Sequence, residues 1–497
     1  MNIQTPITGG NQAHLQISPQ EATEKDLAAI QKLDRDFAAQ KAAFLKDQYP
    51  SLETRVERVL KIRDLFAKHF KDIRAAVRAD YGVHPSPSAD LFETAGPIAR
   101  AEAVAAHLEQ WMTPKKRTGL SPLSGDSVGY VRWEPKGVIG NMSPWNFPFE
   151  IALGPAIEML AAGNRVIIKP SEVTAHCSET LAAIIPDFFE PEVVTTAVGG
   201  IPLAEHFSTL RWDHLLYTGN STIGRRVMAN AARNLVPVTL ELGGKAPAIF
   251  DRDRIDKDAV RKMLGLKATK RGQVCLNVDY CLVHEDDLDA FVELVQADDA
   301  HGLSPNNFRE HSCAIVSERH LARAERMLAE AKDGGATIIT LGQDDYQEDR
   351  CMPLKLVLNA PEGSALMTQE IFGPILPIVP YKSLDDALAR VNAQENALAL
   401  YIFSNDDGFV RKVMDNTRSG GVSVNCCGGQ VQGELPFGGI GESGMGVHHG
   451  EEGFHEFSNP RAIMELKNAP AFDAMLAPYG DVTKHMIGEM FGPENVE

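Results

Sequence analysis

The chain is poor in positive charge. Its 497 residues include 49 Lys and Arg against 67 Asp and Glu, which gives a net charge of −18. Because so acidic a chain is repelled by phosphate backbones and anionic lipid, we expect neither a nucleic acid nor a membrane surface as partner. It also lacks an uninterrupted apolar run of the roughly 18 to 20 residues that a membrane span needs. The longest candidate, IALGPAIEML, contains Pro155 and Glu158, so no membrane span is predicted.

The sequence lacks the basic residues of a targeting segment near its start and the paired cysteines of a typical metal site. The first twenty residues contain no Lys or Arg and no apolar run, so we expect neither a signal nor a transit peptide but a loose or draped arm. The seven cysteines are odd in number and none fits C-x-x-C spacing. This pattern favours reduced thiols in a cytoplasmic protein and predicts no metal site. For each thiol taken alone, a small buried hydrophobic role is the default.

The length and the apolar patterning predict an α/β fold with more than one domain. At 497 residues two or three domains are expected. Apolar residues at helical spacing predict helices over about 21–112. From Gly137 onward short apolar runs alternate with helix-length segments, which is typical of βαβ units around a parallel sheet. A second alternation runs from Ala246 to about Cys426, so two α/β domains should follow a helical lead-in.

Two segments fit neither α/β domain. DSVGYVRWEPKG, residues 126–137, alternates like a hairpin strand, and AIMELK, residues 462–467, could pair with it. Such strands often form an arm that pairs with another subunit. A strand at the edge of its own domain explains the pattern equally well.

Two glycine-rich segments are candidates for binding a dinucleotide. Gly439, Gly441 and Gly444 match G-x-G-x-x-G, but no strand precedes them and no good helix start follows, so we interpret this segment as a turn. In HLLYTGNSTIGRRVMANAA a strand is followed by Gly219, a tight loop, Gly224 and a helix. The N–H groups at such a helix start attract pyrophosphate. A plain strand-to-helix turn would have the same local sequence.

Lys169 and Glu172 lie at the end of the predicted strand RVIIK, where Pro170 stops the strand. A Lys and a carboxylate at the mouth of a parallel sheet suit ribose hydroxyls. A solvated surface pair fits this stretch equally well.

The segment GQVCLNVDYC contains two cysteines, Cys275 and Cys281. A thiol with a pKa of about 8.5 is mostly protonated at neutral pH, so a reactive one needs positive potential nearby, and carbonyl chemistry needs donors aimed at the oxyanion. The amide of Asn146 in SPWNFPFE is a candidate donor. Glu241, at the end of the apolar strand VPVTLEL, is a candidate general base with a raised pKa. A Glu on the wet face of an edge strand is the simpler alternative.

Together these segments resemble the aldehyde dehydrogenase superfamily. PWNFP, KPSE, TGNSTIG, ELGGK, GQVC, EIFGP and LPFGGIGESGMG follow one another in this order, and the resemblance extends from about Leu52 to Leu466. GQVCLNVDY, HHGEEGFHEFS and the short tail resemble the branch that includes fatty and aromatic aldehyde dehydrogenases. Within it, bacterial coniferyl aldehyde dehydrogenases look most similar.

The resemblance implies a role for each matching residue. Cys275 would attack the aldehyde, the Asn146 amide and the Cys275 backbone N–H would hold the oxyanion, and Glu241 would activate the water that hydrolyses the thioester. Cys281, in the predicted strand YCLVH, would only pack. The residues implied in cofactor binding are Lys169, Glu172, Gly219, Gly224, Glu370 and Phe372.

The resemblance also implies an organisation of the chain into domains. Residues 1–121 and 138–240 would form a Rossmann-like cofactor-binding domain with its helical lead-in, and residues 241–459 an α/β catalytic domain. Residues 122–137 and 460–497 would form an oligomerisation arm and the tail of a homodimer. Cys426 and Cys427 would lie in a variable loop facing the substrate, as packing residues, as substrate contacts or as thiols prone to oxidation.

The expected reaction is oxidation of an apolar aldehyde, aromatic or medium-to-long aliphatic, to the carboxylic acid. NAD is the expected cofactor, with NADP as the alternative, because a carboxylate such as Glu172 would repel a ribose 2′-phosphate. Three other functions are alternatives: a relative that passes the thioester to coenzyme A, a phosphate-activating reductase, and a catalytically silent protein on the same fold. The first two do not need a base such as Glu241 to activate water. The third predicts loss of the catalytic set, whereas Asn146, Glu241, Cys275 and Glu370 are all present.

Overall fold

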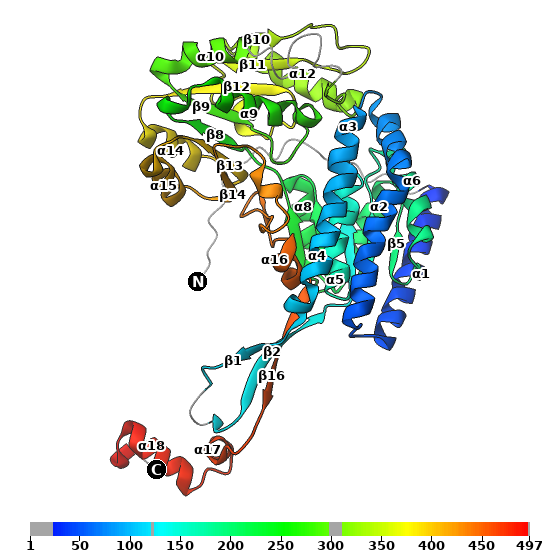
Figure 1. Cartoon of the computed structure of the whole chain (residues 1–497), viewed down its shortest axis with the longest axis vertical. Coiled ribbons are helices and arrows are strands. Elements are labelled where there is room, and N and C mark those ends of the chain that lie inside the picture. Colours follow the sequence, from blue (N-terminus) through cyan, green and yellow to red (C-terminus); the bar gives the residue numbers. More distant parts are fainter. Residues whose placement is uncertain (1–22, 121–123, 298–310, 496–497) are drawn as a thin grey trace, which may run out of the picture.

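The computed structural model describes residues 23–120, 124–297 and 311–495. These residues form two α/β bodies and a long arm (Figure 1). Each body is built around a sheet of mostly parallel strands, which confirms the predicted α/β class. The draped arm expected over the first twenty residues lies outside the described part of the chain.

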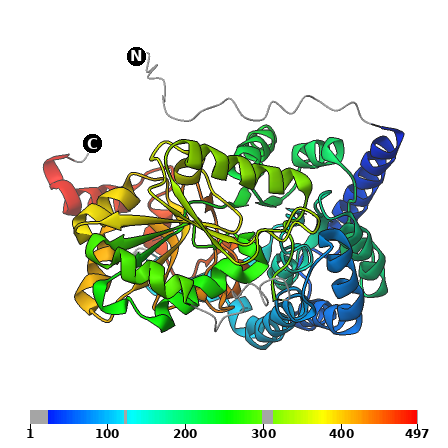
Figure 2. The ribbon, with the colours of Figure 1, turned by 90° about the horizontal axis from the view of Figure 1, so that it is seen from above.

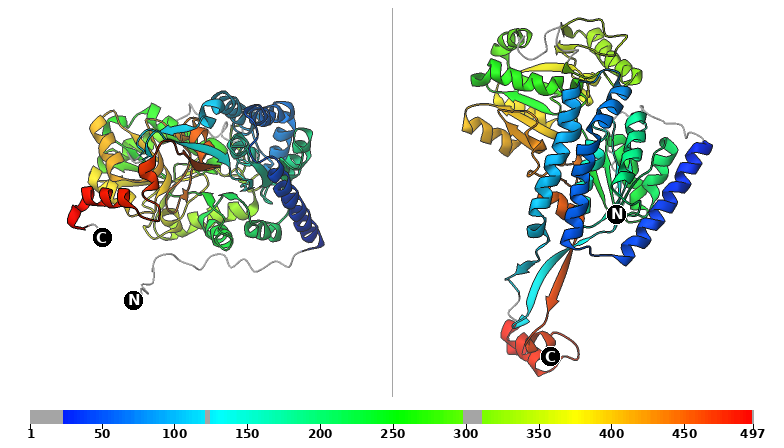
Figure 3. Two further views of the ribbon diagram at one scale, coloured as in Figure 1. Left: turned by 90° about the horizontal axis from the view of Figure 1, so that it is seen from below. Right: turned by 45° about the vertical axis from the view of Figure 1, so that its right-hand side comes forward.

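Long helices precede the first sheet, as the helical spacing predicts. They are α1 (Glu24–Lys46), α2 (Leu52–Tyr81), α3 (Ser86–Ser88), the π-helical η1 (Ala89–Ala95) and α4 (Gly96–Met112). Ser51 caps α2 by accepting a hydrogen bond from the Thr54 N–H. Helices α2 and α4 lie side by side (Figure 3), and both contribute to the core beneath the first sheet.

The first sheet has six strands in the order β15-β7-β6-β3-β4-β5. Five are parallel: β3 (Val138–Met142), β4 (Arg165–Lys169), β5 (Val194–Thr196), β6 (His214–Thr218) and β7 (Val238–Glu241). The helices along this part of the chain are α5 (Glu150–Ala161), α6 (Ala175–Ile184), α7 (Ile201–Thr209) and α8 (Ser221–Ala232). Because the strands are parallel, the segments that follow Lys169, Thr218 and Glu241 emerge at the same edge of the sheet.

The sixth strand, β15 (Gly444–Met445), comes from the glycine-rich segment that matches G-x-G-x-x-G. It pairs antiparallel with β7, with Gly444 opposite Glu241. A side chain on Gly444 would collide with the carbonyl oxygen of Leu240, so glycine is required here for the close approach of two backbones. The prediction that this segment is a turn and not a dinucleotide-binding loop is confirmed.

The second sheet has seven strands in the order β10-β11-β12-β9-β8-β13-β14, seen from above in Figure 2. They are β8 (Pro247–Phe250), β9 (Tyr280–His284), β10 (Thr337–Leu341), β11 (Leu354–Leu358), β12 (Ile375–Tyr381), β13 (Ala397–Phe403) and β14 (Ser419–Val424). Only β10 runs antiparallel to its neighbour in this sheet. The accompanying helices are α9 (Lys257–Ala268), α10 (Leu288–Gln296), α12 (Glu318–Asp333), α13 (Ala365–Thr368), α14 (Leu384–Asn392) and α15 (Asp407–Asn416).

The arm is a separate sheet of three antiparallel strands, β1 (Lys115–Arg117), β2 (Val128–Pro135) and β16 (Ser458–Glu465). The predicted pairing of its two long strands is confirmed, and the alternative of an edge strand on an α/β sheet is wrong. Helix α16 (Gly450–Glu456) precedes β16, while α17 (Pro470–Asp473) and α18 (Asp481–Phe491) lie at the far end of the arm (Figure 1). The division into domains by residue range stays a prediction.

Short 3₁₀ turns link several of these elements: η3 (Ile185–Asp187), η4 (Arg252–Arg254), η5 (Thr269–Gly272), η6 (Glu285–Asp287), η8 (Gly429–Val431) and η9 (Pro493–Asn495). Within the described residues, no helix has both the length and the apolarity needed to cross a membrane.

Asn164 joins the first sheet to the base of the arm. Its fully buried side chain accepts a hydrogen bond from the Gly137 N–H (2.9 Å) and donates to the carbonyl oxygens of Met159 (3.0 Å) and Phe457 (2.8 Å). Three segments distant in sequence therefore share one amide.

We predict that Asn164→Ala lowers the free energy of unfolding by about 3 kcal/mol, because the Gly137 N–H and two carbonyl groups would be left buried without this partner. Asn416→Ala is the control, since its exposed amide donates only to the Lys412 carbonyl within its own helix. Chemical denaturation of the two variants should show a large shift only for Asn164→Ala; equal shifts would contradict the role given to Asn164.

Candidate active site

The candidate nucleophile Cys275 follows a strained turn. Lys270, Arg271 and Gly272 have successive positive φ angles of 49°, 55° and 74°. A side chain on Gly272 would overlap the carbonyl group of Gly373, so only glycine fits where this turn meets the loop that carries Glu370. Non-glycine residues persist in this region only where surrounding contacts fix them.

Buried polar contacts fix this turn. The Arg271 guanidinium donates to the carbonyl oxygens of Cys313 and Met352. The Gln273 side chain donates to the Ala314 carbonyl at 3.0 Å and accepts from the Val316 N–H at 2.9 Å. The backbone that precedes Cys275 is therefore anchored to the segment 313–316, and these contacts stabilise the strained conformation of the turn.

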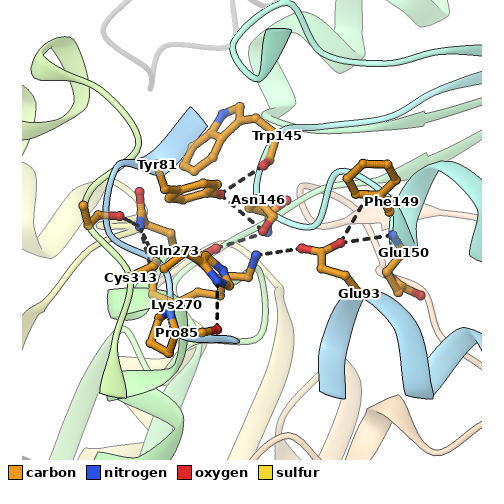
Figure 4. Close-up of polar contacts among 12 residues, drawn as sticks. Tyr81, Pro85, Glu93, Trp145, Asn146, Phe149, Glu150, Lys270, Gln273 and Cys313 are labelled. Carbon is orange, nitrogen blue, oxygen red and sulfur yellow. Dashed lines mark hydrogen bonds and ion pairs between the residues drawn. The ribbon is translucent and has the colours of Figure 1, made fainter. Parts of the chain in front are cut away.

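Asn146 lies against the same segment. Its side-chain amide is almost fully buried and donates to the carbonyl oxygen of Gln273 at 3.1 Å. On the other side, the Tyr81 hydroxyl donates to the carbonyl oxygen of Trp145 at 3.0 Å (Figure 4). Because an amide nitrogen carries two hydrogens, one contact to Gln273 leaves a second N–H for a ligand.

A buried ion pair joins these two loops. The Lys270 ammonium lies 2.7 Å from one carboxylate oxygen of Glu93, and both side chains are fully buried. The other oxygen of Glu93 accepts hydrogen bonds from the N–H groups of Phe149 (3.1 Å) and Glu150 (3.2 Å) at the start of α5 (Figure 4). The turn before Cys275 and the loop that carries Asn146 are thus both tied to one carboxylate.

No sequence motif predicts this ion pair. Glu93 and Lys270 are 177 positions apart, and each lies in a segment that looks like ordinary charged surface. The local sequence around either residue cannot indicate this contact, because the contact forms only when two loops that are distant in the sequence pack together.

Glu241 is buried at the end of β7, between β6 and β15, and is not on the wet face of an edge strand. Neither of its carboxyl oxygens has a hydrogen-bond partner among the described residues. Burial, and secondarily the charge of Glu456, raise the pKa of Glu241 well above its usual value, as predicted. A carboxylate whose pKa is raised has a higher affinity for a proton than a solvated carboxylate, as a general base requires.

The Cys275 thiol lies in a field of carboxyl groups. Burial raises its pKa to about 12, and the nearby charges of Glu370, Glu241 and Glu150 contribute in the same direction. The positive potential that a reactive thiolate requires is therefore not supplied by these side chains, and the resting thiol is protonated.

The residues expected to bind the adenosine ribose and the pyrophosphate gather at the carboxyl edge of the first sheet. The buried Lys169 ammonium lies 2.6 Å from a carboxylate oxygen of Glu172, which is 43% exposed, so the alternative of a fully solvated pair is wrong. Gly219 follows β6, and its N–H donates to the Glu241 carbonyl oxygen at 3.0 Å. Gly224 lies in the first turn of α8, where a Cβ would come within 2.9 Å of the Leu242 side chain.

Glu370 lies on a loop fixed from several sides. The Arg323 guanidinium donates to the carbonyl oxygens of Glu370 (2.6 Å) and Ile371 (2.7 Å), and the Ile371 N–H donates to the Asp279 carboxylate (3.0 Å). A side chain on Gly243 would overlap the Glu370 carboxyl group, so this glycine makes room for it. The next aromatic residue, Phe372, has a φ of +50° and packs edge-on against Trp145 at 5.3 Å between ring centroids.

The side chains that hold this loop were also missed. Arg323, Asp279 and Lys245 contact it or one another: the Lys245 ammonium pairs with Asp279 and donates to the carbonyl oxygens of Leu366 and Gln369. Lys245 follows directly after the glycines of ELGGK, and that position was the only available hint.

The remaining cysteines separate by burial. Cys281 is fully buried in β9, which confirms its packing role. Cys426 and Cys427 are half-buried, and Cys427 packs at the margin of the apolar cluster that Cys275 also touches.

A thiol, a buried carboxyl group and an amide donor beside the carboxyl edge of a Rossmann-like sheet are the groups that an oxidoreductase with a covalent intermediate would use. The sequence profile of the aldehyde dehydrogenase family matches residues 12–463. The chain belongs to this family, and it is an NAD(P)-dependent oxidoreductase acting on aldehydes.

Individual relatives agree with this membership. The chain is 38% identical over 461 residues to a probable coniferyl aldehyde dehydrogenase of Caulobacter vibrioides, covering 91% of this chain and 95% of the relative. It is 32% identical over 441 residues to a dimeric NADP-preferring aldehyde dehydrogenase of Rattus norvegicus, covering 88% and 95%. The fold is similar to AldH of Staphylococcus aureus in a substrate-bound state, with a TM-score of 0.86 and 29% identity over 92% of this chain and 99% of that one. It is also similar to a Mycobacterium tuberculosis aldehyde dehydrogenase complexed with NAD⁺, with a TM-score of 0.80, 25% identity, and coverage of 89% and 91%.

Glu370 generates a prediction about stability and pH. Burial first, and then the charge of Asp279, raise its pKa from 4.5 to about 8. A carboxyl group whose pKa is higher in the folded state favours folding below its unfolded pKa and loses that contribution as the pH rises to about 8. We therefore predict that Glu370→Gln, without cofactor, gains stability over the parent chain across this window, by an amount on the order of 1 to 4 kcal/mol at pH 8.5.

Paired denaturation curves from pH 5 to pH 8.5 check this prediction. The difference between Glu370→Gln and the parent chain should be small at pH 5 and grow toward pH 8.5. A difference that stays constant across this range would show that Glu370 is ionised in the fold at all these pH values.

Proposed function

We propose that this enzyme oxidises an apolar aldehyde to the free carboxylic acid through a thioester on Cys275, which water attacks with Glu241 as the base. The observation that carries the proposal is the buried carboxyl group of Glu241, which has no hydrogen-bond partner among the described residues and whose charge contributes to the raised pKa of the Cys275 thiol. An enzyme that transfers the acyl group to coenzyme A or phosphate must protect the thioester from water, and a base beside it would promote hydrolysis instead.

Cys275 is the proposed nucleophile and Asn146 the proposed oxyanion donor. The thiol proton passes to a water molecule, the sulfur forms a bond to the carbonyl carbon, and the π electrons of the carbonyl bond move to its oxygen, where negative charge develops. The Asn146 amide, already oriented by its bond to the Gln273 carbonyl, would donate its second N–H to that oxygen together with the Cys275 backbone N–H. A preorganised donor of this kind contributes about 100-fold to 1,000-fold in rate.

Glu241 is the proposed base for the second half of the reaction. After the substrate carbon has been oxidised to a thioester, Glu241 takes a proton from a water molecule whose oxygen attacks the carbonyl carbon. The carbon–sulfur bond then breaks, the acid leaves, and the thiol recovers its proton. A carboxyl group with a raised pKa is suited to this work near neutral pH.

The cofactor-binding residues present fit NAD or NADP. Lys169 and Glu172 would contact the adenosine ribose, Gly219 and Gly224 would line the pyrophosphate, and Glu370 would hold the nicotinamide ribose. The buried Lys169, the space kept free beside Glu370 by Gly243 and the helix start of α8 at Ser221 favour this assignment. When bound, the cofactor supplies a hydride acceptor and the positive charge that the site's own side chains lack. Phe372 would pack near it through its contact with Trp145.

For the substrate we propose an aromatic aldehyde of the coniferyl type, with medium or long aliphatic aldehydes as the second group. The support is the name carried by the Caulobacter vibrioides relative at 38% identity. NAD is the proposed cofactor of choice, because the Glu172 carboxylate beside Lys169 would repel a 2′-phosphate.

For the assembly we propose a homodimer formed through the arm. Helix α18, at the end of the arm, exposes four large apolar side chains: Val482, Ile487, Met490 and Phe491. Exposed apolar side chains that gather on one short element favour an interface there. A cytoplasmic location is proposed on the reduced-thiol pattern of the sequence.

Variants of three residues test the mechanism. Cys275→Ala should abolish reduction of the cofactor, whereas Cys281→Ala, its matched control in β9, should keep activity within a few-fold. Glu241→Gln should give at most one equivalent of reduced cofactor and then stall, because the thioester cannot be hydrolysed. Stopped-flow absorbance at 340 nm measures all three; steady turnover by Glu241→Gln would refute its role as base.

A panel of aldehydes tests substrate and cofactor together. Cinnamaldehyde-type, benzaldehyde-type and straight-chain aldehydes are assayed with NAD and with NADP, in the absence of coenzyme A. We expect the highest kcat/KM with a cinnamaldehyde-type substrate and NAD. Turnover that appears only on adding coenzyme A would overturn the hydrolytic mechanism.

A further inference from the structure

A row of buried polar side chains leads from α5 to Glu241. Arg100 donates two hydrogen bonds to the fully buried Glu158, from Nε at 2.8 Å and from Nη2 at 2.7 Å. The same Nη2 lies 3.1 Å from Nδ1 of His448. The other ring nitrogen of His448, Nε2, lies 3.9 Å from a carboxyl oxygen of Glu241. The proposed reaction as described so far gives no role to His448.

The contact with Arg100 decides where the His448 proton is. A guanidinium has only donors, so Nδ1 of His448 must accept and cannot carry a hydrogen. Burial, and secondarily the positive charge of Arg100, lower the pKa of His448 well below its usual value, so the ring is neutral. A neutral imidazole has one N–H, which is therefore on Nε2, the nitrogen that faces Glu241.

Other ionisable groups lie around this pair. They come from α4, α5, α16, the loop before α16 and the loop that carries the thiol: Arg100, Glu150, Glu158, Glu456, His449 and Cys275. The Arg100 side chain is directed to Glu158, Glu150 and His448, and the charge of Glu456 disfavours a negative charge on Glu241. The Nε2–H of His448 is thus placed where the ionised form of Glu241 needs a partner.

We propose that His448 is a positioning residue for Glu241, whose carboxylate it holds through Nε2–H when that group is ionised to activate water. The proposal rests on the proposed function, since it deepens the role of Glu241 as base. The 3.9 Å separation is too long for a hydrogen bond, so the contact closes only as Glu241 turns toward the ring in its ionised form. Arg100 acts at one remove, by fixing which nitrogen of His448 carries the hydrogen.

The test compares His448→Ala, His448→Phe and His448→Gln in the full-length enzyme with cofactor and a good aldehyde substrate. Ala and Phe remove the donor, and Phe keeps a ring of similar size, so that one of the two serves if the other does not fold. Gln places an amide N–H near the position of Nε2. The measurements are the burst of reduced cofactor, kcat, and the pH dependence of kcat.

We expect the burst to be unchanged in all three variants, because acylation of Cys275 does not need ionised Glu241. In the Ala and Phe variants kcat should fall about 10-fold or more at pH 7, the loss expected for one hydrogen bond to a charged group. Their acidic limb of kcat should move upward by about one pH unit, since an ionised Glu241 without its donor has a higher pKa. The Gln variant should restore most of kcat and return the acidic limb most of the way to its original position.

His449→Ala is the matched control, because His449 is a neighbouring imidazole of similar burial whose Nδ1 has no hydrogen-bond partner among the described residues. It should leave the acidic limb of kcat in place. An unshifted acidic limb in the Ala and Phe variants, or an equal loss of burst and kcat, would overturn the proposal and show that His448 has only a packing role. Failure of the proposed function gives a different result: Glu241→Gln would then turn over steadily, whatever the His448 variants do.

Discussion

The buried ion pair between Glu93 and Lys270 is the contact on which the arrangement of the site depends. One carboxylate holds both the ammonium of the turn before Cys275 and the two N–H groups that open α5, just after Asn146. A fully buried charge is tolerated only when its partner and its hydrogen bonds are all in place. The proposed nucleophile and the proposed oxyanion donor come from different α/β bodies, and this ion pair ties the segments that carry them to one carboxylate.

Burial sets the proton affinity of the groups in the site. It raises the pKa values of Cys275, Glu241 and Glu370 above their usual values, so the resting thiol is protonated. Such a site avoids premature reaction of the thiol, and Glu241 in its ionised form has a high affinity for the proton that it takes from water. The cost is a cluster of buried carboxyl groups that weakens the fold as the pH rises.

Much of this architecture could be predicted from the sequence, because the signals that indicate it lie within short segments. Strand-to-helix alternation predicted both parallel sheets, and the context of GIGESG excluded it as a dinucleotide loop, because these signals are contained in short segments. The site residues Cys275, Asn146 and Glu241 were proposed from motifs, and their roles stay a prediction. The supporting contacts of Lys270 and His448 could not be predicted, since each depends on side chains from distant elements that meet only in the folded chain.

The central claim is that a covalent acyl intermediate forms on Cys275 and that Glu241 is needed to release it. The most direct measurement is mass spectrometry of Glu241→Gln after incubation with an aldehyde and oxidised cofactor. The account predicts an acyl group on the peptide that contains Cys275, at close to one per chain and located on that residue and not on Cys281. An unmodified Cys275, or an acyl group on Cys426 or Cys427 instead, would contradict it.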